Sequence, residues 1–287
     1  MDEHKYGEEN LSFEESLQKL DEISDADTDP KVASEFVTER VKSLTEKSVR
    51  HDISAMTGTR HEGWIHPDSE VRRTFIVDPV NINDDQAYTV LIDVLKQMKA
   101  AGWKERGMRA TLMPAIQHAI GTYFGNHYAT EHTEMQNREF YIDHVSVDSA
   151  NVSLSELRGK GFAVCAEKAA LAQNMLAFAG MQTELILSNC QLIPGSEKEL
   201  HTYNIISSDG SKHALYDPTN PIFLNDENGK LLSTQPSIHP LTDEQYQSLI
   251  RGESVTVKHQ SYKKSGDKWE LESEHDSIYA GPRNTGA

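Results

Sequence analysis

The stretch GFAVCAEKAALAQNMLAFAG, residues 161–180, decides how the rest of the chain is interpreted. A short apolar segment leads into an alanine-rich run, and Gly180 is a suitable residue to follow a helix. We therefore predict a helix that begins near Cys165 and ends at Phe178. The unpaired N–H groups and the dipole of a helix N-terminus favour an anion. Since the thiolate is the nucleophilic form of cysteine, Cys165 stands where a nucleophile is favoured.

Two later motifs, HTYN at 201–204 and YDPT at 216–219, supply partners for this thiol. We predict three strands in this part of the chain, at 183–187, 201–206 and 212–216. The last two form a hairpin, and neighbouring antiparallel strands lie about 5 Å apart, so we expect His201 and Asp217 to meet. One long helix followed by antiparallel strands is an α+β arrangement.

Cys165, His201 and Asp217 are, in that order, a thiol nucleophile, a base and an orienting carboxylate. The carboxylate fixes the tautomer of the imidazole and stabilises its charged form. Each residue alone has an ordinary explanation. A cysteine in a helix is commonly a small core residue, and an Asp-Pro pair is typical of turns. The position at a helix start and the two downstream partners together favour the catalytic interpretation.

The motifs GFAVCAEKA (161–169), HTYN (201–204) and YDPTNP (216–221) together resemble the transglutaminase-like superfamily of papain-fold cysteine enzymes. The resemblance is close over residues 155–222 and extends in outline over 84–245. It implies an α+β fold with a papain-like transglutaminase core, in which the catalytic cysteine begins a helix packed on an antiparallel sheet. It also implies a catalytic triad with Cys165 as nucleophile, His201 as general base and acid, and Asp217 as orienting residue.

The resemblance implies thiol-mediated acyl transfer at a carboxamide of a protein or peptide substrate, without a cofactor or a metal. The leading expectation is a cysteine hydrolase, meaning a transglutaminase-like protease or amidase. A protein-glutamine transglutaminase or deamidase is the first alternative, and a catalytically inactive binding scaffold is the second. Animal transglutaminases have flanking β-domains and calcium sites, and peptide N-glycanases usually have a four-cysteine zinc site. Neither pattern is present in this sequence.

The sequence gives weaker evidence for the residues that stabilise the oxyanion or bind the substrate. By the resemblance, the backbone N–H of Cys165 and one upstream side chain hold the oxyanion. The upstream candidates are Gln136, Asn137, Asn126 and Trp103. Tyr203 and Asn204 are candidates for substrate support, or they are structural supports of the hairpin. For Glu167 a charge in the first turn of the helix is a better explanation than a catalytic acid.

The composition argues against several kinds of binding partner. A formal net charge of −17 argues against a nucleic-acid partner, since binding to the phosphate backbone requires fields of Lys and Arg. No apolar run approaches the length of a membrane span, and the N-terminus has no apolar signal segment, so we expect a cytoplasmic protein without a membrane partner. Two cysteines are too few for a disulfide scaffold or a four-cysteine zinc site, and the 13 histidines include no HExxH motif.

The sequence suggests three regions. These are a helical N-terminal extension at 1–60, a transglutaminase-like catalytic domain at 61–250, and a short β-rich, partly disordered C-terminal tail at 251–287. The extension is either a surface pair of helices or an arm that regulates the site or binds a partner. Further helices are predicted at 84–101 and 109–124, with Pro114 in the first turn of the second or breaking it. Residues 125–155 suggest irregular structure, with strand character at 140–147.

Overall fold

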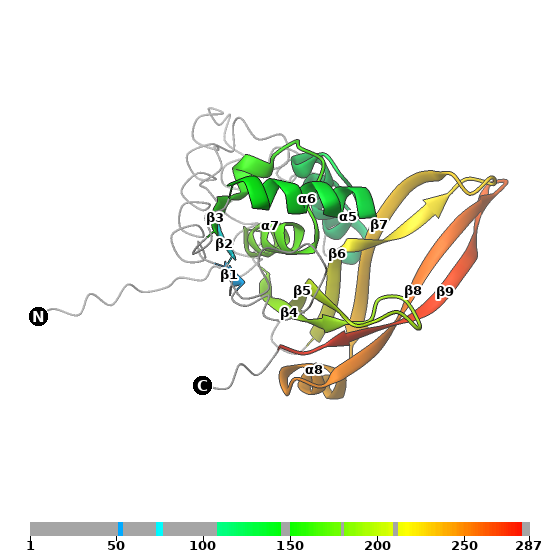
Figure 1. Ribbon diagram of the computed structural model, residues 1–287. Coiled ribbons are helices and arrows are strands. Elements are labelled where there is room, and N and C mark those ends of the chain that lie inside the picture. The colour runs from blue at the N-terminus through cyan, green and yellow to red at the C-terminus, as the bar shows by residue number, and fades with distance from the viewer. Residues whose placement is uncertain are drawn as a thin grey trace, which may run out of the picture.

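A computed structural model describes residues 51–53, 73–76, 108–144, 150–178, 181–208 and 212–282. Most of the predicted N-terminal extension, the helix predicted at 84–101 and Gly180 lie outside the described residues. The described part is an α+β structure in which most helices lie together on one side of a large curved sheet, whereas the helix at 243–250 lies apart from them (Figure 1). Among the described helices, none has the length and apolar character that crossing a membrane requires.

Two of the described helices follow the sequence prediction closely. Helix α7 spans Cys165–Phe178, so the predicted helix and its start at the cysteine are confirmed. Helix α5 spans Met108–Phe124 with Pro114 inside it, and therefore the proline neither opens nor breaks the helix. A proline inside a helix removes one backbone hydrogen bond, and here the chain tolerates that loss.

Helix α6, Glu131–His144, replaces the irregular structure expected over this segment. Its start is fixed by a reciprocal cap, because the N–H of Thr133 donates to Thr130 Oγ1 at 3.2 Å and the N–H of Thr130 donates to Thr133 Oγ1 at 2.6 Å. The helix buries Asn137 and Phe140, which lie one turn apart. A face with a polar residue at its centre does not produce the apolar periodicity that predicts a helix.

Two sheets are described. The smaller sheet joins β1 (His51–Ile53), β2 (Arg73–Ile76) and β3 (Ala150–Ser153), and a short 3-10 turn, η1 (Leu154–Leu157), follows it. The larger sheet has six strands, with the order β4-β5-β6-β8-β9 and with β7 paired to β6. Its strands are β4 (Gln182–Cys190), β5 (Glu199–Ser208), β6 (Lys212–Asn225), β7 (Leu231–Leu241), β8 (Ser254–Ser265) and β9 (Lys268–Ala280). The three predicted strands correspond to β4, β5 and the first part of β6, and each continues further than predicted.

Strand β6 changes its partner in the middle of its length. It pairs with β5 up to Tyr216 and runs parallel to β8 from Phe223 to Asn225. Between these parts its register with β7 shifts, in a stretch that contains Pro218 and Pro221. Because proline cannot donate to a ladder, these residues interrupt regular pairing. Irregularities of this kind are common beside functional sites.

The segment predicted as a C-terminal tail belongs to the same sheet. Strands β8 and β9 form a long hairpin that projects away from the helices (Figure 1). Helix α8, Asp243–Ile250, precedes this hairpin and begins with a capping box formed by Thr242 and Gln245. The far end of β9 returns to the end of β4, where Gln191 and Ile278 exchange two backbone hydrogen bonds of 2.9 and 2.8 Å. The sheet thus curls back toward its first strand.

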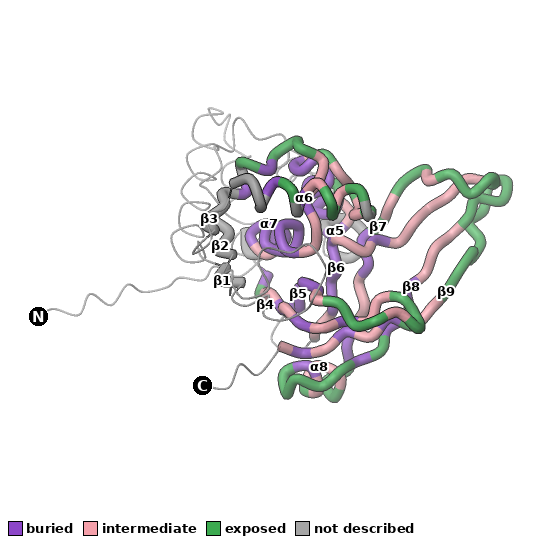
Figure 2. The backbone as a smooth tube through the Cα atoms, viewed as in Figure 1, coloured by how far each residue is buried: buried purple, intermediate pink, exposed green. Residues whose placement is uncertain are grey.

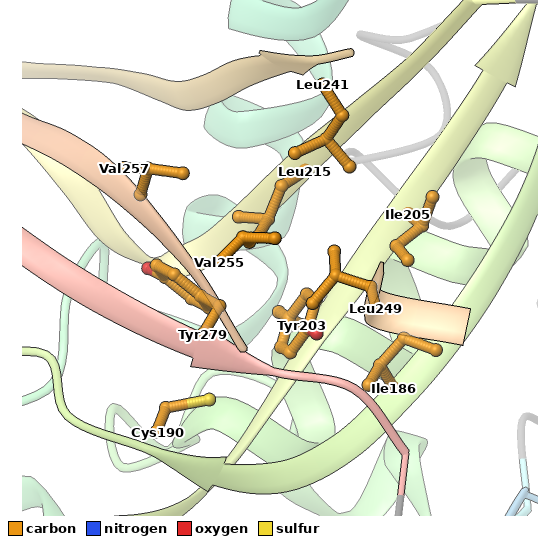
Figure 3. Close-up of a cluster of buried hydrophobic side chains, with 10 residues drawn as sticks. All are labelled: Ile186, Cys190, Tyr203, Ile205, Leu215, Leu241, Leu249, Val255, Val257 and Tyr279. Atoms are coloured by element: carbon orange, nitrogen blue, oxygen red, sulfur yellow. The ribbon is translucent and has the colours of Figure 1, made fainter. Parts of the chain in front are cut away.

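The core has two parts, one on each side of β5. Helix α7 is buried along most of its length (Figure 2), because small residues such as Ala166 and Ala169 allow close contact with its neighbours. The Asn204 side chain faces this helix and donates to the Ala169 carbonyl at 3.2 Å. The adjacent Tyr203 faces an apolar cluster on the other side, as strand alternation requires. Figure 3 shows this cluster, made of Ile186, Cys190, Tyr203, Ile205, Leu215, Leu241, Leu249, Val255, Val257 and Tyr279.

Candidate active site

A buried histidine–aspartate pair lies where β5 and β6 meet. His201 lies in the first part of β5, opposite Ser188 of β4, and Asp217 lies just before the irregular stretch of β6. His201 Nε2 is 2.7 Å from Asp217 Oδ2. The side chain of His201 is 7% exposed and that of Asp217 is 0% exposed. The pair is therefore shielded from water, and each member depends on the other for its charged form.

Three further donors satisfy the Asp217 carboxylate. Oδ1 accepts the backbone N–H groups of Thr219 at 3.0 Å and Asn220 at 3.2 Å. Oδ2 accepts the hydroxyl of Tyr279 at 2.7 Å, in addition to its contact with His201. The Asp-Pro-Thr-Asn sequence thus forms a local turn around its own aspartate, as an Asx motif does. All four partners of the carboxylate are donors, which fixes its orientation toward the imidazole.

The electrostatic environment favours the charged form of both residues. Burial by itself lowers the pKa of His201, but the charge and hydrogen bond of Asp217 and the neighbouring Cys165 thiol raise this pKa well above its ordinary value. Burial by itself raises the pKa of Asp217, but His201 and the hydrogen bonds of Tyr279 and Thr219 hold this pKa below its ordinary value. Both shifts favour an ion pair between the two side chains.

Cys165 completes the arrangement from the first position of α7. Its side chain is partly exposed and lies near enough to His201 to contribute to the raised pKa of that imidazole. Since Nε2 of the imidazole is held by Asp217, Nδ1 is the nitrogen left for the thiol. The structure therefore brings the three predicted residues together, although they come from three different elements. The other cysteine, Cys190, is buried in the apolar cluster, and burial raises its pKa.

The start of α7 is capped by its own glutamate. Val164 O accepts the first helical hydrogen bond, from Lys168 N at 3.1 Å, and Glu167 Oε2 accepts the N–H of Val164 at 3.0 Å. This is the return half of a capping box. Asn137 of α6 donates to the other oxygen, Oε1, at 3.1 Å. Glu167 thus lies in the first turn of α7, as the sequence suggested, and it fixes the backbone of Val164, the residue before Cys165.

A tight contact between two loops supports this helix start. Gly161 N donates to Phe124 O at 2.7 Å, and Asn126 Nδ2 donates to Ala163 O at 2.9 Å. Gly161 has φ +80, a conformation that residues with a Cβ atom rarely adopt. At Gly125 a Cβ atom would meet the backbone of the facing loop at 3.2 Å. The glycines therefore allow the end of α5 to brace the segment that presents the thiol.

The residues predicted to support substrate or oxyanion lie in several environments. Asn137 is occupied by Glu167, and Gln136 is half-buried on α6. The Tyr203 hydroxyl donates to Ala280 O at 2.7 Å, and Asn204 is bonded to α7, so both support the structure around β5. Trp103 lies outside the described residues. The structure thus does not bring Asn137, Tyr203 or Asn204 to the thiol by any hydrogen bond described for them.

Sequence reasoning missed two residues that hold the aspartate turn. Tyr279 lies in β9, beyond the predicted domain boundary, and no local pattern marks it as a partner of Asp217. Gln117 of α5 is buried, where its Nε2 donates to Pro218 O at 3.0 Å and its Oε1 accepts the Tyr216 hydroxyl at 2.8 Å. These three contacts join residues that are 62 to 101 positions apart in the sequence, so no local motif can reveal them.

No family model, curated protein or solved structure matches the chain. A thiol at a helix N-terminus beside a carboxylate-bound imidazole can transfer its proton and attack an electrophilic carbon. Within the part of the chain that the structure describes, no group of three or more His, Cys, Asp or Glu side chains is arranged to hold a metal ion.

Proposed function

We propose that the chain is a cysteine-nucleophile acyl-transfer enzyme with a papain-like, transglutaminase-like core, and that it cleaves peptide or amide bonds. The observation that carries this proposal is the bridging position of His201, which is held by the buried Asp217 on one side and lies beside the partly exposed Cys165 thiol on the other. This is the geometry required of a thiol nucleophile, its base and an orienting group.

The proposed reaction begins with the thiolate of Cys165 attacking the carbonyl carbon of a bound carboxamide. Negative charge that develops on the carbonyl oxygen is stabilised by N–H groups at the first turn of α7, beginning with that of Cys165 itself. The tetrahedral intermediate collapses when His201 Nδ1 donates its proton to the leaving nitrogen. A thioester with Cys165 remains, and water activated by the neutral His201 hydrolyses it and regenerates the thiol.

The proposal takes a protein or peptide as the substrate and the cytoplasm as the compartment. Both described cysteines are free thiols, which suits a reducing compartment. The helices that the sequence predicts at 1–60 would then regulate the site or recruit a partner. If an amine replaces water as the acyl acceptor, the same site performs the transglutaminase reaction. If the site is catalytically inactive, the protein is a binding scaffold.

Alkylation tests whether the thiol is activated. Folded protein treated with iodoacetamide at pH 7 should react at Cys165 much faster than at Cys190, which mass spectrometry of the two peptides can resolve. The active-site variant His201→Ala is the comparison, and it should slow only the reaction of Cys165. Equal and slow alkylation of the two cysteines would overturn the enzyme proposal and favour the scaffold.

A peptide library then separates the possible reactions. Acyl groups trapped on Cys165 identify the substrate, and Cys165→Ala is the control that must trap nothing. New N-termini support a protease, release of ammonia from glutamine supports a deamidase, and incorporation of an added amine supports a transglutaminase. Trapping of no acyl group by an activated thiol would overturn the proposed carboxamide chemistry.

A further inference from the structure

A lysine lies fully buried within one turn of the candidate nucleophile. Lys168 is 0% exposed, and its Nζ has no hydrogen-bond partner among the described residues. An ammonium group without hydrogen bonds is costly to bury, so nearby negative charge must compensate it. The proposed reaction uses Cys165, His201 and Asp217, and it assigns no role to this group.

Negative groups approach Lys168 from two elements. Glu167 and Cys165 lie on the same helix, α7, and Asp217 approaches from β6. His127, in the connection between α5 and α6, is a further titratable neighbour, and burial, His118 and Lys168 lower its pKa. Burial lowers the pKa of Lys168 to about 8, against the opposing effect of the three negative groups. The ammonium form of Lys168 is therefore the main form at pH 7.

The charge balance of the site depends on this ammonium. When the thiolate of Cys165 forms, it joins the Asp217 and Glu167 carboxylates, and His201 supplies one positive charge among three negative ones. Lys168 supplies a second positive charge. Because its ammonium has no hydrogen-bond partner among the described residues, it is not committed to any one of the three negative groups. A cation beside a thiol favours the thiolate, because the attraction exists only after the proton has left.

We propose that Lys168 is an electrostatic positioning residue of this site, whose buried ammonium stabilises the thiolate of Cys165. The inference rests on the proposed function, because it concerns the reactivity of the same thiol. The alternative role is structural, in which Lys168 only balances Glu167 and Asp217 and leaves the thiol unaffected. The two roles differ in the pH at which Cys165 becomes reactive.

The pH profile of alkylation tests the proposal in the full chain. Lys168→Met keeps the length of the side chain and removes the charge, and Lys160→Met removes an exposed lysine that precedes the same helix. Iodoacetamide rates at Cys165 between pH 5 and pH 10 give the midpoint of activation. We expect Lys168→Met to raise this midpoint by about one pH unit, and Lys160→Met to leave it unchanged. A folded Lys168→Met protein with the wild-type midpoint would overturn the inference.

A reciprocal measurement needs no substitution, and it applies even if Lys168→Met does not fold. Coupling between two sites is mutual, so alkylating Cys165 should lower the titration midpoint of Lys168 by about the same one unit. The resonance of the Lys168 Cε carbon, followed in protein labelled with ¹³C-lysine, reports this midpoint before and after alkylation. An unchanged midpoint would refute the inference. An unreactive wild-type thiol would instead refute the proposed function, so the two failures are distinguishable.

Discussion

Replacing Asp217 with asparagine tests the role of the buried pair most directly. The two backbone N–H groups of Thr219 and Asn220 need an acceptor, and they therefore retain the amide oxygen in the place of Oδ1. The amide nitrogen then takes the place of Oδ2, where it faces two more donors, His201 Nε2–H and the Tyr279 hydroxyl. Two N–H donors cannot bond to each other, so Nε2 of the imidazole must lose its proton and accept the N–H of the new amide. The neutral imidazole then carries its proton on Nδ1, next to the thiol.

The effect of Asp217→Asn on the reactivity of Cys165 and on stability can be estimated. An imidazole with its proton on Nδ1 cannot accept the proton of Cys165, and the imidazolium loses its counter-charge. The thiol then behaves as an ordinary cysteine, of which about 3% is thiolate at pH 7. The proposed function requires the wild-type thiol to react as the thiolate, so on that proposal we expect alkylation of Cys165 at pH 7 to be up to roughly 30-fold slower in Asp217→Asn. Disrupting the buried pair should also cost roughly 3–5 kcal/mol of unfolding free energy.

The assay is the rate of iodoacetamide modification at each cysteine, measured by mass spectrometry of the digested protein. Cys190 is 0% exposed and serves as an internal reporter, because its modification signals unfolding. Asp226→Asn is the matched control, since Asp226 also accepts backbone N–H groups in a turn, at 2.8 Å from both Asn228 and Lys230, but has no histidine partner. A folded Asp217→Asn protein that modifies Cys165 at the wild-type rate would show that the tautomer argument is wrong.

Three further predictions follow from the same contacts. Tyr279→Phe removes a hydrogen bond to a carboxylate and should lower the unfolding free energy by about 2 kcal/mol in urea titrations, against about 1 kcal/mol for Tyr203→Phe, which loses a bond to a carbonyl. Gly161→Ala should cost about 1–2 kcal/mol and slow Cys165 alkylation, while Gly229→Ala, also at positive φ but in a distant turn, should cost the same and leave alkylation unchanged. The stability advantage of the wild type over Asp217→Asn should be greatest between about pH 4 and 6.5 in urea titrations. It should fall in acid, because the pKa of the aspartate is lowered by folding, and fall as the pH rises through the raised pKa of its histidine partner.

The local parts of the site were predictable from the sequence because neighbouring residues produce them. The helix from Cys165 to Phe178 follows from an alanine-rich run, and its start follows from the cap that Glu167 provides three residues after Val164. The hairpin of β5 and β6 follows from two apolar runs joined by a polar loop. Helix α6 was not predictable in this way, because its buried face includes Asn137, whose partner Glu167 lies in another helix.

By itself, the sequence singled out Cys165, His201 and Asp217 as candidates for the chemistry and predicted the helix and the hairpin that carry them. Only the tertiary structure decided that the thiol and the imidazole are neighbours, that Tyr279 from the end of the chain holds the carboxylate, and that Lys168 is buried without a hydrogen bond. The physical reason is that these contacts join distant segments and depend on how the sheet curls. Backbone propensities and caps act over a few residues, whereas burial and charge compensation depend on the whole packed molecule.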